Sequence, residues 1–429
     1  MRLFFNNSRF SFFVGCIICL LLTACGGGGS GTSSGNNSGG GSSGGTGGGG
    51  NTTRSGSNVV PITVDSSVFN VPNEPFIAVT ICSPTNPSIC MTVDHILVDT
   101  GSVGLRIFNQ PANSSTTLSS TLNLPPATAS GNPIGECLQF VQGNTWGPLK
   151  LGNIKIGGET ASNVALQIIN DANFIAAPSA CTSSGTLMNT PTDFGANGVL
   201  GIGTSLQDCG STCTQPGSGI YFICIQNSNT CTDTGMLLAS QIQNPVSTFG
   251  TDNNGVIVSF NAVSSIGDVS ATGTLTFGID TQTNNASKNL NTLIVDSYYG
   301  TFTTTFEGQT YQDSYIDSGS NGLFFNSPNS ITQCPGNSNG FYCPNSNLNL
   351  TAQLSGLTGS TPAVSVAFNV GNGNNLTGYA LNNLAGTATD VPGLGKTFDW
   401  GLPFFFGRDV YFVIEGAHTT KQAGPYVGF

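Results

Sequence analysis

Short apolar stretches separated by polar turns make up most of the chain from residue 59 onwards. Gly, Asn, Ser or Pro follows each stretch, with a spacing of roughly 8–12 residues that is typical of β-sandwiches and barrels. Asn-Gly pairs at 197–198 and 254–255 are strong turn signals, whereas helical periodicity is weak and has its best candidate at 235–243. The pattern therefore predicts an all-β body. Its clearest candidate strands are 76–81, 95–99, 153–157, 256–260, 274–277, 293–295 and 411–414.

The first 25 residues have the pattern of an export signal. Two arginines precede an apolar run over 12–22, which is too short for a convincing membrane span but suits a signal peptide. The run ends in Leu-Thr-Ala-Cys at 22–25, which resembles the lipobox of bacterial lipoproteins. The resemblance implies that residues 1–25 are a lipoprotein signal peptide and that Cys25 carries lipid and anchors the chain to a membrane. Gly26, where an aspartate would signal inner-membrane retention, implies the outer membrane in a host with two membranes. The alternative is an ordinary secretory signal with a chance cysteine.

A polar segment then separates this signal from the body. Residues 26–57 contain Gly, Ser, Asn and Thr and almost no apolar side chains. This composition predicts a disordered, flexible linker with a coil reach of roughly 30 Å. The remaining chain is long enough for two domains. We expect an N-terminal β lobe over 58–248 and a C-terminal β lobe over 249–429.

Charge and composition narrow the class of partner. The chain of 429 residues carries 10 Lys and Arg against 21 Asp and Glu, a formal net charge of −11. This acidic balance argues against DNA or RNA as a partner. Only 7% of residues are charged and the mean hydropathy is +0.08, which argues against disorder of the whole chain. Because His95 and His418 are the two histidines, we expect no His-rich metal site, and we expect no cofactor.

The cysteines fit an exported protein. Three of the 13 lie in or at the end of the signal peptide, which leaves an even number in the body, mostly in close pairs. Zinc is the rival interpretation, but the sequence has no Cys-x-x-Cys pair with a nearby histidine, so disulfides are favoured. Sequence alone does not prove connectivity. Proximity suggests Cys82–Cys90, Cys209–Cys213, Cys224–Cys231 and Cys334–Cys343, which leaves Cys137–Cys181.

An internal repeat carries the candidate chemistry. The segments 96–105 and 314–323 share the pattern apolar, apolar, Asp, Thr or Ser, Gly, Ser, any residue, Gly, Leu. Their aspartates, Asp99 and Asp317, lie in opposite halves of the mature chain. One Asp-Thr-Gly tripeptide is a weak signal, whereas two copies in matched contexts are a strong one.

At these residues the sequence resembles the pepsin-like aspartic peptidases, and it is also similar to uncharacterised bacterial lipoproteins that carry the same double motif. Other family markers occur in the expected order. They lie at 197–203, 273–280, 402–411 and 424–429, and the resemblance covers roughly 70–429. It implies two pseudo-symmetric β lobes of the pepsin-like acid protease type, with a cleft between the lobes that holds a peptide or protein substrate.

The resemblance also implies a reaction. Asp99 and Asp317 would be a catalytic pair of carboxyls. Two carboxyls about 3 Å apart cannot both ionise easily, so they share a proton and titrate as a pair. The ionised carboxylate takes a proton from a water molecule held between them, and the protonated carboxyl donates to the carbonyl oxygen of the peptide bond.

The other residues of the two turns support the carboxyls in this family. They provide hydroxyls that hydrogen-bond to the opposite loop, hydroxyls that bind the outer carboxylate oxygens, and glycines that permit the tight turn. Thr100 and Ser318 match the hydroxyls that bond to the opposite loop. Ser102 and Ser320 match the hydroxyls that bind the outer oxygens, and Gly101 and Gly319 match the glycines of the turn. We expect the apolar-apolar-Gly segments at 199–201 and 405–407 to brace the two catalytic loops from behind.

Two positions depart from the family pattern. The region of the flap, 138–147, has no tyrosine. Phe140 or Trp146 could close the site instead, and Trp146 is favoured because its indole N–H can donate a hydrogen bond; otherwise Trp146 is a packing residue. Arg106 replaces a usual aromatic residue. It either binds a substrate carboxylate or, as we favour, pairs with an acid such as Glu136 or Glu159.

These features together predict a monomeric, lipid-anchored aspartic endopeptidase of the bacterial envelope. The first alternative is a catalytically inactive relative whose cleft binds peptide or another envelope ligand. The second is a structural surface lipoprotein whose Asn-, Ser- and Thr-rich loops mediate contacts.

Overall fold

The described part of the chain folds mostly into β-strands, which confirms the predicted all-β class. The computed structural model describes residues 54–288, 290–338, 340–357, 362–388 and 397–429. The predicted signal peptide, Cys25 and nearly all of the predicted linker lie outside these residues. Within them, no helix is long and apolar enough to cross a membrane. The helices described are α1 (Leu118–Leu122), α2 (Ser179–Thr182) and α3 (Pro191–Phe194), with short 3-10 turns such as η3 (Leu238–Ser240) in the weak helix candidate at 235–243.

A larger sheet runs through both halves of the described chain. All seven candidate strands named from the sequence fall on strands of this sheet. In spatial order its strands are β11 (Thr230–Asp233), β10 (Tyr221–Ile225), β6 (Asn132–Gln139), β7 (Asn144–Ile156), β8 (Glu159–Ile169), β4 (Val103–Phe108), β9 (Gly198–Ile202), β3 (Cys90–Asp99), β2 (Pro75–Cys82), β1 (Val59–Val64), β13 (Ala271–Phe277), β12 (Gly255–Phe260), β22 (Asp409–Val413), β23 (Tyr426–Gly428) and β14 (Thr292–Ile294), with β5 (Thr128–Ala129) beside β6.

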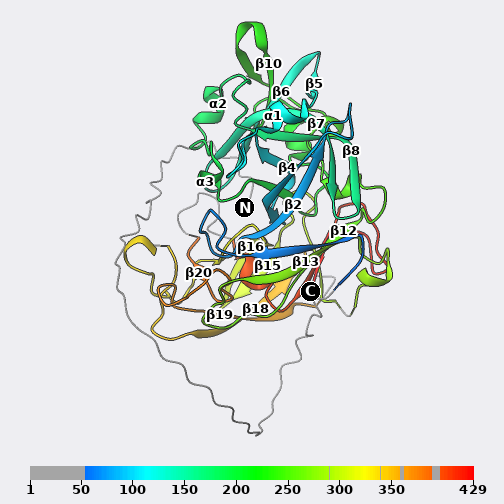
Figure 1. Cartoon of the computed structure of the whole chain (residues 1–429). Helices are drawn as coiled ribbons and strands as arrows, with labels where there is room; N and C mark the ends of the chain where they lie inside the picture. The colour runs from blue at the N-terminus through cyan, green and yellow to red at the C-terminus, as the bar shows by residue number, and fades with distance from the viewer. Residues whose placement is uncertain (1–53, 289, 339, 358–361, 389–396) are drawn as a thin grey trace, which may run out of the picture.

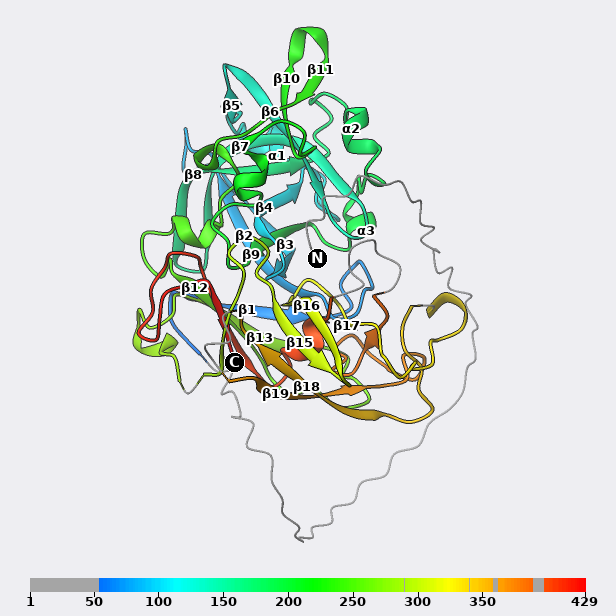
Figure 2. The same ribbon diagram turned by 180° about the vertical axis from the view of Figure 1, so that it is seen from behind.

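A smaller sheet belongs to the second half alone. Its strands in spatial order are β19 (Val364–Val370), β18 (Leu348–Ser355), β15 (Phe302–Phe306), β16 (Gln309–Ile316), β21 (Asp399–Trp400), β17 (Leu323–Phe324) and β20 (Ala385–Gly386). Figures 1 and 2 show β5 to β8 and β10 gathered in the upper part of the molecule, whereas β13, β15, β18 and β19 gather in the lower part.

Strand β1 joins the two parts. It pairs with β13 over six residues, Val59–Val64, and with β2 over two, Thr63 and Val64. Its inward side chains Val60, Ile62 and Val64 are buried, while Pro61 and Thr63 point outward, as alternation along a half-buried strand requires. These three side chains belong to a core cluster that contains residues from both halves. Burial of apolar surface therefore holds the two parts together.

The two Asp-containing motifs occupy equivalent strand arrangements. Strand β3 ends at Asp99 and runs parallel to β9, which is antiparallel to β4. In the second half β16 ends just before Asp317 and runs parallel to β21, which is antiparallel to β17. Every residue of β9 is buried, which explains its near-continuous apolar sequence. Each motif turn thus connects two strands that both pair with the same central strand, and this central strand fixes the position of the turn.

The central strand of the second arrangement was predicted wrongly. The bracing segment is β21 followed by Gly401, six residues before the predicted 405–407. Gly401 is required there because a Cβ atom would lie 2.1 Å from the Gly322 carbonyl oxygen. Trp400 is fully buried and stacks on Phe398 at a centroid distance of 4.4 Å. A Phe-Phe-Gly sequence matched the expected pattern, but it follows the prolyl turn η7 (Leu402–Phe404), and Phe406 forms a bridge with Phe260 of β12 instead. The first bracing segment, 199–201, lies in β9 as predicted.

The described residues contain five disulfides, and all five match the pairing suggested by proximity. Cys82–Cys90 and Cys224–Cys231 close the β2–β3 and β10–β11 hairpins. The other three are Cys137–Cys181, Cys209–Cys213 and Cys334–Cys343. Cys137–Cys181 ties strand β6 to α2 across 44 residues, the longest of these separations.

We expect the Cys137–Cys181 bond to stabilise the fold more than Cys209–Cys213. Both bonds are buried, but they span 44 and 4 residues, and chain entropy makes them worth about 4 and about 2 kcal/mol. Urea unfolding of the two Cys→Ala double variants measures this difference. Equal losses in the two variants would show that loop closure does not set the contribution of these bonds.

Candidate active site

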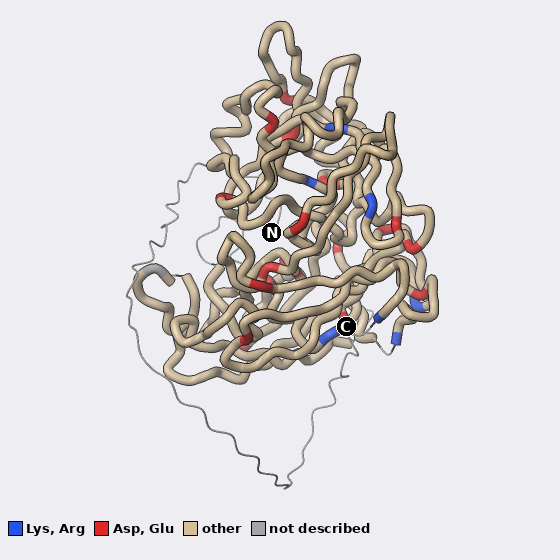
Figure 3. Tube along the Cα trace, viewed as in Figure 1, with Lys and Arg blue, Asp and Glu red and all other residues tan. Residues whose placement is uncertain are grey.

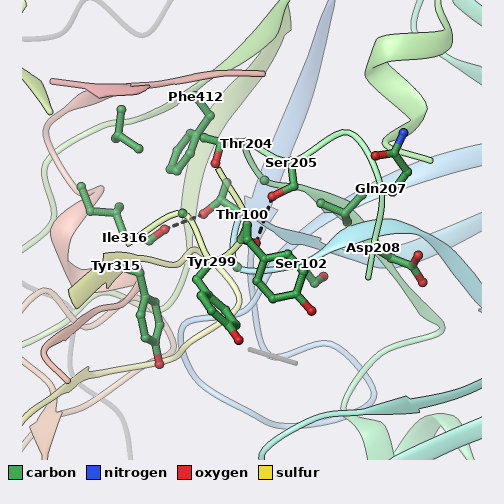
Figure 4. A pocket seen from close by; sticks show the side chains of 16 residues that line it. Thr100, Ser102, Thr204, Ser205, Gln207, Asp208, Tyr299, Tyr315, Ile316 and Phe412 are labelled. Carbon is green, nitrogen blue, oxygen red and sulfur yellow. Dashed lines mark hydrogen bonds between the residues drawn. The ribbon is translucent and has the colours of Figure 1, made fainter. Parts of the chain in front are cut away.

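Reciprocal hydrogen bonds join the two motif turns. The amide of Thr100 donates to Ser318 Oγ at 3.1 Å, and the amide of Ser318 donates to Thr100 Oγ1 at 2.9 Å. Each hydroxyl then donates to a carbonyl of the opposite strand: Thr100 Oγ1 to Ile316 at 3.2 Å, and Ser318 Oγ to Val98 at 2.7 Å. Both side chains are buried, and Figure 4 shows the bond from Thr100 to Ile316. The two turns therefore lie directly against each other, although their aspartates are far apart in the sequence.

The two carboxyls have matching local partners. Asp99 Oδ1 accepts from the Gly101 amide at 2.9 Å, and Asp317 Oδ1 accepts from the Gly319 amide at 2.8 Å. The outer oxygens accept from hydroxyls, with Ser102 Oγ 2.5 Å from Asp99 Oδ2 and Ser320 Oγ 2.9 Å from Asp317 Oδ2. The structure thus brings together all eight motif residues named from the sequence.

Gly101 shows how closely the turns approach. A Cβ atom at this position would lie 2.6–2.7 Å from all three atoms of the Asp317 carboxyl group. Contacts below 3.0 Å essentially do not occur for real Cβ atoms, so only glycine allows the opposite carboxyl to reach this place. The need for glycine here is steric and does not come from a positive φ angle.

The two carboxyls interact electrostatically. Both Asp99 and Asp317 are fully buried. Burial raises the pKa of Asp99 to about 7, and the charge of Asp317 and a hydrogen bond between the two side chains act in the same direction, while Ser102 opposes them. Because the groups are coupled, this value belongs to the pair. Below about pH 7 the pair therefore holds at least one proton.

Two cavities flank the turns. One, of about 60 Å³, lies beside the first turn and is lined by Ser102, Thr204, Tyr299 and Phe412 among others (Figure 4). The second, of about 250 Å³, lies beside the second turn and is lined by Gly319 and Ser320 among others. Tyr315 contributes to both walls. Each of the two turns therefore borders a cavity of its own.

Neither Phe140 nor Trp146 closes over the site, so the flap prediction needs correction. Trp146 is buried, donates its indole N–H to the Ile175 carbonyl at 2.8 Å and packs on Phe222. Phe140 is buried against Phe194. The two rings belong to separate core clusters, Phe140 to one that contains Phe194 and Trp146 to one that contains Phe222. The tip of the same hairpin, Val141 and Gln142, lines the larger cavity instead. No sequence pattern indicates this, because the hairpin register decides which side chains face the site.

Arg106 is part of a buried ionic cluster. It pairs with Glu136, at 2.7 and 3.1 Å, which is one of the two acids suggested for it. It also contacts Asp208 at 2.9 Å, and the hydroxyl of Tyr221 donates to the other oxygen of Asp208 at 2.5 Å. Burial raises the pKa of Asp208 well above its ordinary value, and the charge of Glu136 acts in the same direction. Asp208 also lines the smaller cavity, a role that no motif or spacing indicated.

No metal site is apparent in the described ranges. No group of three or more His, Cys, Asp or Glu side chains in them is arranged to hold a metal ion. What the arrangement offers chemically is a pair of buried carboxyls, with two hydroxyl groups and two amides that orient them.

We expect the Arg106→Met substitution to lower the free energy of unfolding by about 3–5 kcal/mol, because it leaves the buried acids Glu136 and Asp208 without their cation. Urea unfolding of the oxidised protein measures this. Lys155→Met, which removes an exposed cation from β7, is the control and should stay within about 0.5 kcal/mol of wild type. Similar stability of the two variants would refute a structural role for the cluster.

Comparison with known proteins places the chain in a family without an assigned activity. The model of the family described as "Protein of unknown function (DUF3443)" matches residues 54–429, which span the whole described part of the chain. No curated protein matches the sequence. Because the family match covers well over half of the sequence, the chain belongs to the DUF3443 family.

Proposed function

We propose that this protein is an aspartic endopeptidase whose catalytic pair is Asp99 and Asp317. The observation that carries the proposal is the cross-linked pair of turns: two buried carboxyls held together by reciprocal bonds between Thr100 and Ser318. A turn that only stabilised its own half would not need to place a buried, titratable carboxyl against its counterpart, because burial of such a group is costly. Perturbed pairs of this kind cluster at functional sites.

The reaction follows from the sharing of one proton. A water molecule between the carboxyls loses a proton to the ionised one while its oxygen attacks the carbonyl carbon of the peptide bond. The protonated carboxyl donates to the carbonyl oxygen. When the tetrahedral intermediate collapses, the C–N bond breaks and the carboxyl that took the proton from water gives it to the nitrogen. A hydroxyl of the intermediate returns a proton to the other carboxylate, so that a carboxylic acid and an amine leave and the pair is regenerated. Gly101, Gly319, Ser102 and Ser320 orient the carboxyls through the bonds described above.

The overall architecture in this proposal is pepsin-like, with two β lobes and the peptide lying across the cleft between them. The equivalent arrangements β3–β9–β4 and β16–β21–β17 support it, since each places one aspartate at the end of its first strand. We further propose that the protein acts as a monomer and is anchored through lipid on Cys25 to the bacterial envelope, in the outer membrane where there are two membranes. The Leu-Thr-Ala-Cys sequence at 22–25 supports this location.

We expect Asp99→Asn and Asp317→Asn each to lower peptide cleavage by about 10²–10⁴-fold, because each substitution removes one partner in acid–base catalysis. Cleavage of a diverse peptide library by the full-length oxidised protein, with and without pepstatin, is the measurement. Asp313→Asn is the matched control, because Asp313 is exposed on the same strand, β16. If a folded wild type cleaves nothing, or if both site variants retain its activity, the peptidase proposal is wrong and a peptide-binding cleft becomes the better explanation.

Cleavage should also depend on pH in a defined direction. The raised pKa of Asp99, about 7, means that the pair loses its last proton as the pH rises through that value. The carboxyl that donates to the carbonyl oxygen is then missing. We therefore expect kcat/KM to decline above about pH 7, approaching a tenfold loss for each pH unit. The pH profile of library-derived substrates measures this, and a profile that stays level well into the alkaline range would exclude proton sharing as the basis of activity.

A further inference from the structure

The larger cavity contains a half-buried acid that the peptidase mechanism does not use. Glu74 lines this cavity of about 250 Å³, together with Asp399, Val141 and Phe324. Its Oε2 atom is shielded from solvent and has no hydrogen-bond partner among the described residues. Its Oε1 atom packs against Gly195, where a Cβ atom would lie only 2.9 Å away. A buried carboxyl oxygen without a donor is costly, so this position calls for a ligand that supplies one.

The loop that carries Glu74 is fixed beside the second catalytic turn. The neighbouring residue Asn73 is fully buried, and its side-chain amide donates to the carbonyls of Asn321 and Leu381, each at 2.8 Å. Its Oδ1 accepts from the Leu381 amide at 2.7 Å. Asn321 directly follows Ser320, whose hydroxyl binds Asp317. Glu74 is therefore positioned in advance on the Asp317 side of the site and does not lie on a free loop.

The walls of the cavity have a composition that suits one kind of group. Of the described residues that line it, two are acidic, Glu74 and Asp399, and none is basic. Val71, Val141 and Phe324 provide apolar surface in the same wall. Basic side chains are also sparse over the described chain as a whole (Figure 3). A side chain with a long apolar stem and a cationic end would contact both the apolar residues and the acidic residues of this wall.

We propose that this cavity binds the lysine or arginine side chain of a peptide substrate, with Glu74 as its ionic partner and Asp399 as a second acid. The inference rests on the proposed peptidase function for the nature of the ligand as a peptide. It adds a substrate class: peptides with a basic residue close to the cleaved bond, on the side held by Asp317. The cavity is smaller than a typical site for a whole ligand, which suits a subsite for a side chain.

The electrostatics of Glu74 agree with this assignment. Burial raises the pKa of Glu74 well above its ordinary value, because the charged form loses its hydration. An ammonium or guanidinium group in the cavity would restore a favourable environment for the carboxylate. Binding of a basic side chain is therefore expected to lower the pKa of Glu74, whereas an apolar side chain of the same shape would leave that pKa raised.

The test combines binding and cleavage. Full-length oxidised protein is incubated with a randomised peptide library, and the bound peptides are identified with the Asp99→Asn protein so that turnover does not deplete them. Cleaved peptides are identified with the wild type. A selected lysine peptide is then compared with its norleucine counterpart, which keeps the apolar stem and lacks the charge. Glu74→Gln tests the ionic partner, and Glu307→Gln, an exposed acid in the β15–β16 turn, is the control for net charge.

We expect lysine and arginine to be enriched among the bound peptides. We also expect norleucine to weaken binding about tenfold or more, and Glu74→Gln to abolish the difference between the two peptides while Glu307→Gln keeps it. Absence of enrichment, absence of binding, or an unchanged preference in Glu74→Gln would overturn the inference. Cleavage without a basic preference would overturn it while leaving the peptidase proposal intact. Glu74-dependent binding without cleavage would support the basic subsite and refute the peptidase proposal.

Discussion

The reciprocal bonds between Thr100 and Ser318 are the constraint on which the rest of the site depends. Each hydroxyl accepts from the amide of the opposite turn and donates to a carbonyl of the opposite strand, so the turns have one relative position. That position forces two acids into a buried space where both cannot easily be charged. Because the turns lie so close together, only glycine fits at position 101. Because the acids are buried beside each other, the pKa of Asp99 is raised.

The sheets provide the rigidity that this arrangement needs. Strands β9 and β21 each lie between the two strands that flank an aspartate turn, and Gly401 allows the second of these contacts. Strand β1 belongs to the first half by sequence but pairs mainly with β13 of the second half. The halves therefore share a core as well as a site. In the proposed peptidase this shared core would keep the carboxyls aligned while a peptide occupies the cavities beside them.

Features that depend on local sequence were predictable, and features that depend on tertiary register were not. The turn residues follow from short motifs, four disulfide pairs follow from short separations and Cys137–Cys181 follows as the remaining pair; the structure shows all five. Trp146 was misassigned because the register of a hairpin decides which face a side chain occupies. Asp208 and Glu74 reach their cavities from loops distant in sequence from both aspartates, and a lone acidic residue in a loop carries no local signal. The second brace was misplaced because its sequence, Asp399-Trp400-Gly401, lacks the apolar-apolar-Gly pattern, which the nearby segment 405–407 matches.

The central claim is that Asp99 and Asp317 share a proton, and titration of their carboxyl carbons tests it most directly. In protein with ¹³C-labelled aspartate, NMR should show a buried carboxyl that titrates near pH 7 and whose signal is absent from Asp99→Asn. In Asp317→Asn the same signal should titrate at lower pH, because a neighbouring acid no longer opposes ionisation. The account would be contradicted if no carboxyl assigned to this pair titrated above its ordinary range, or if Asp317→Asn left the titration of Asp99 unchanged.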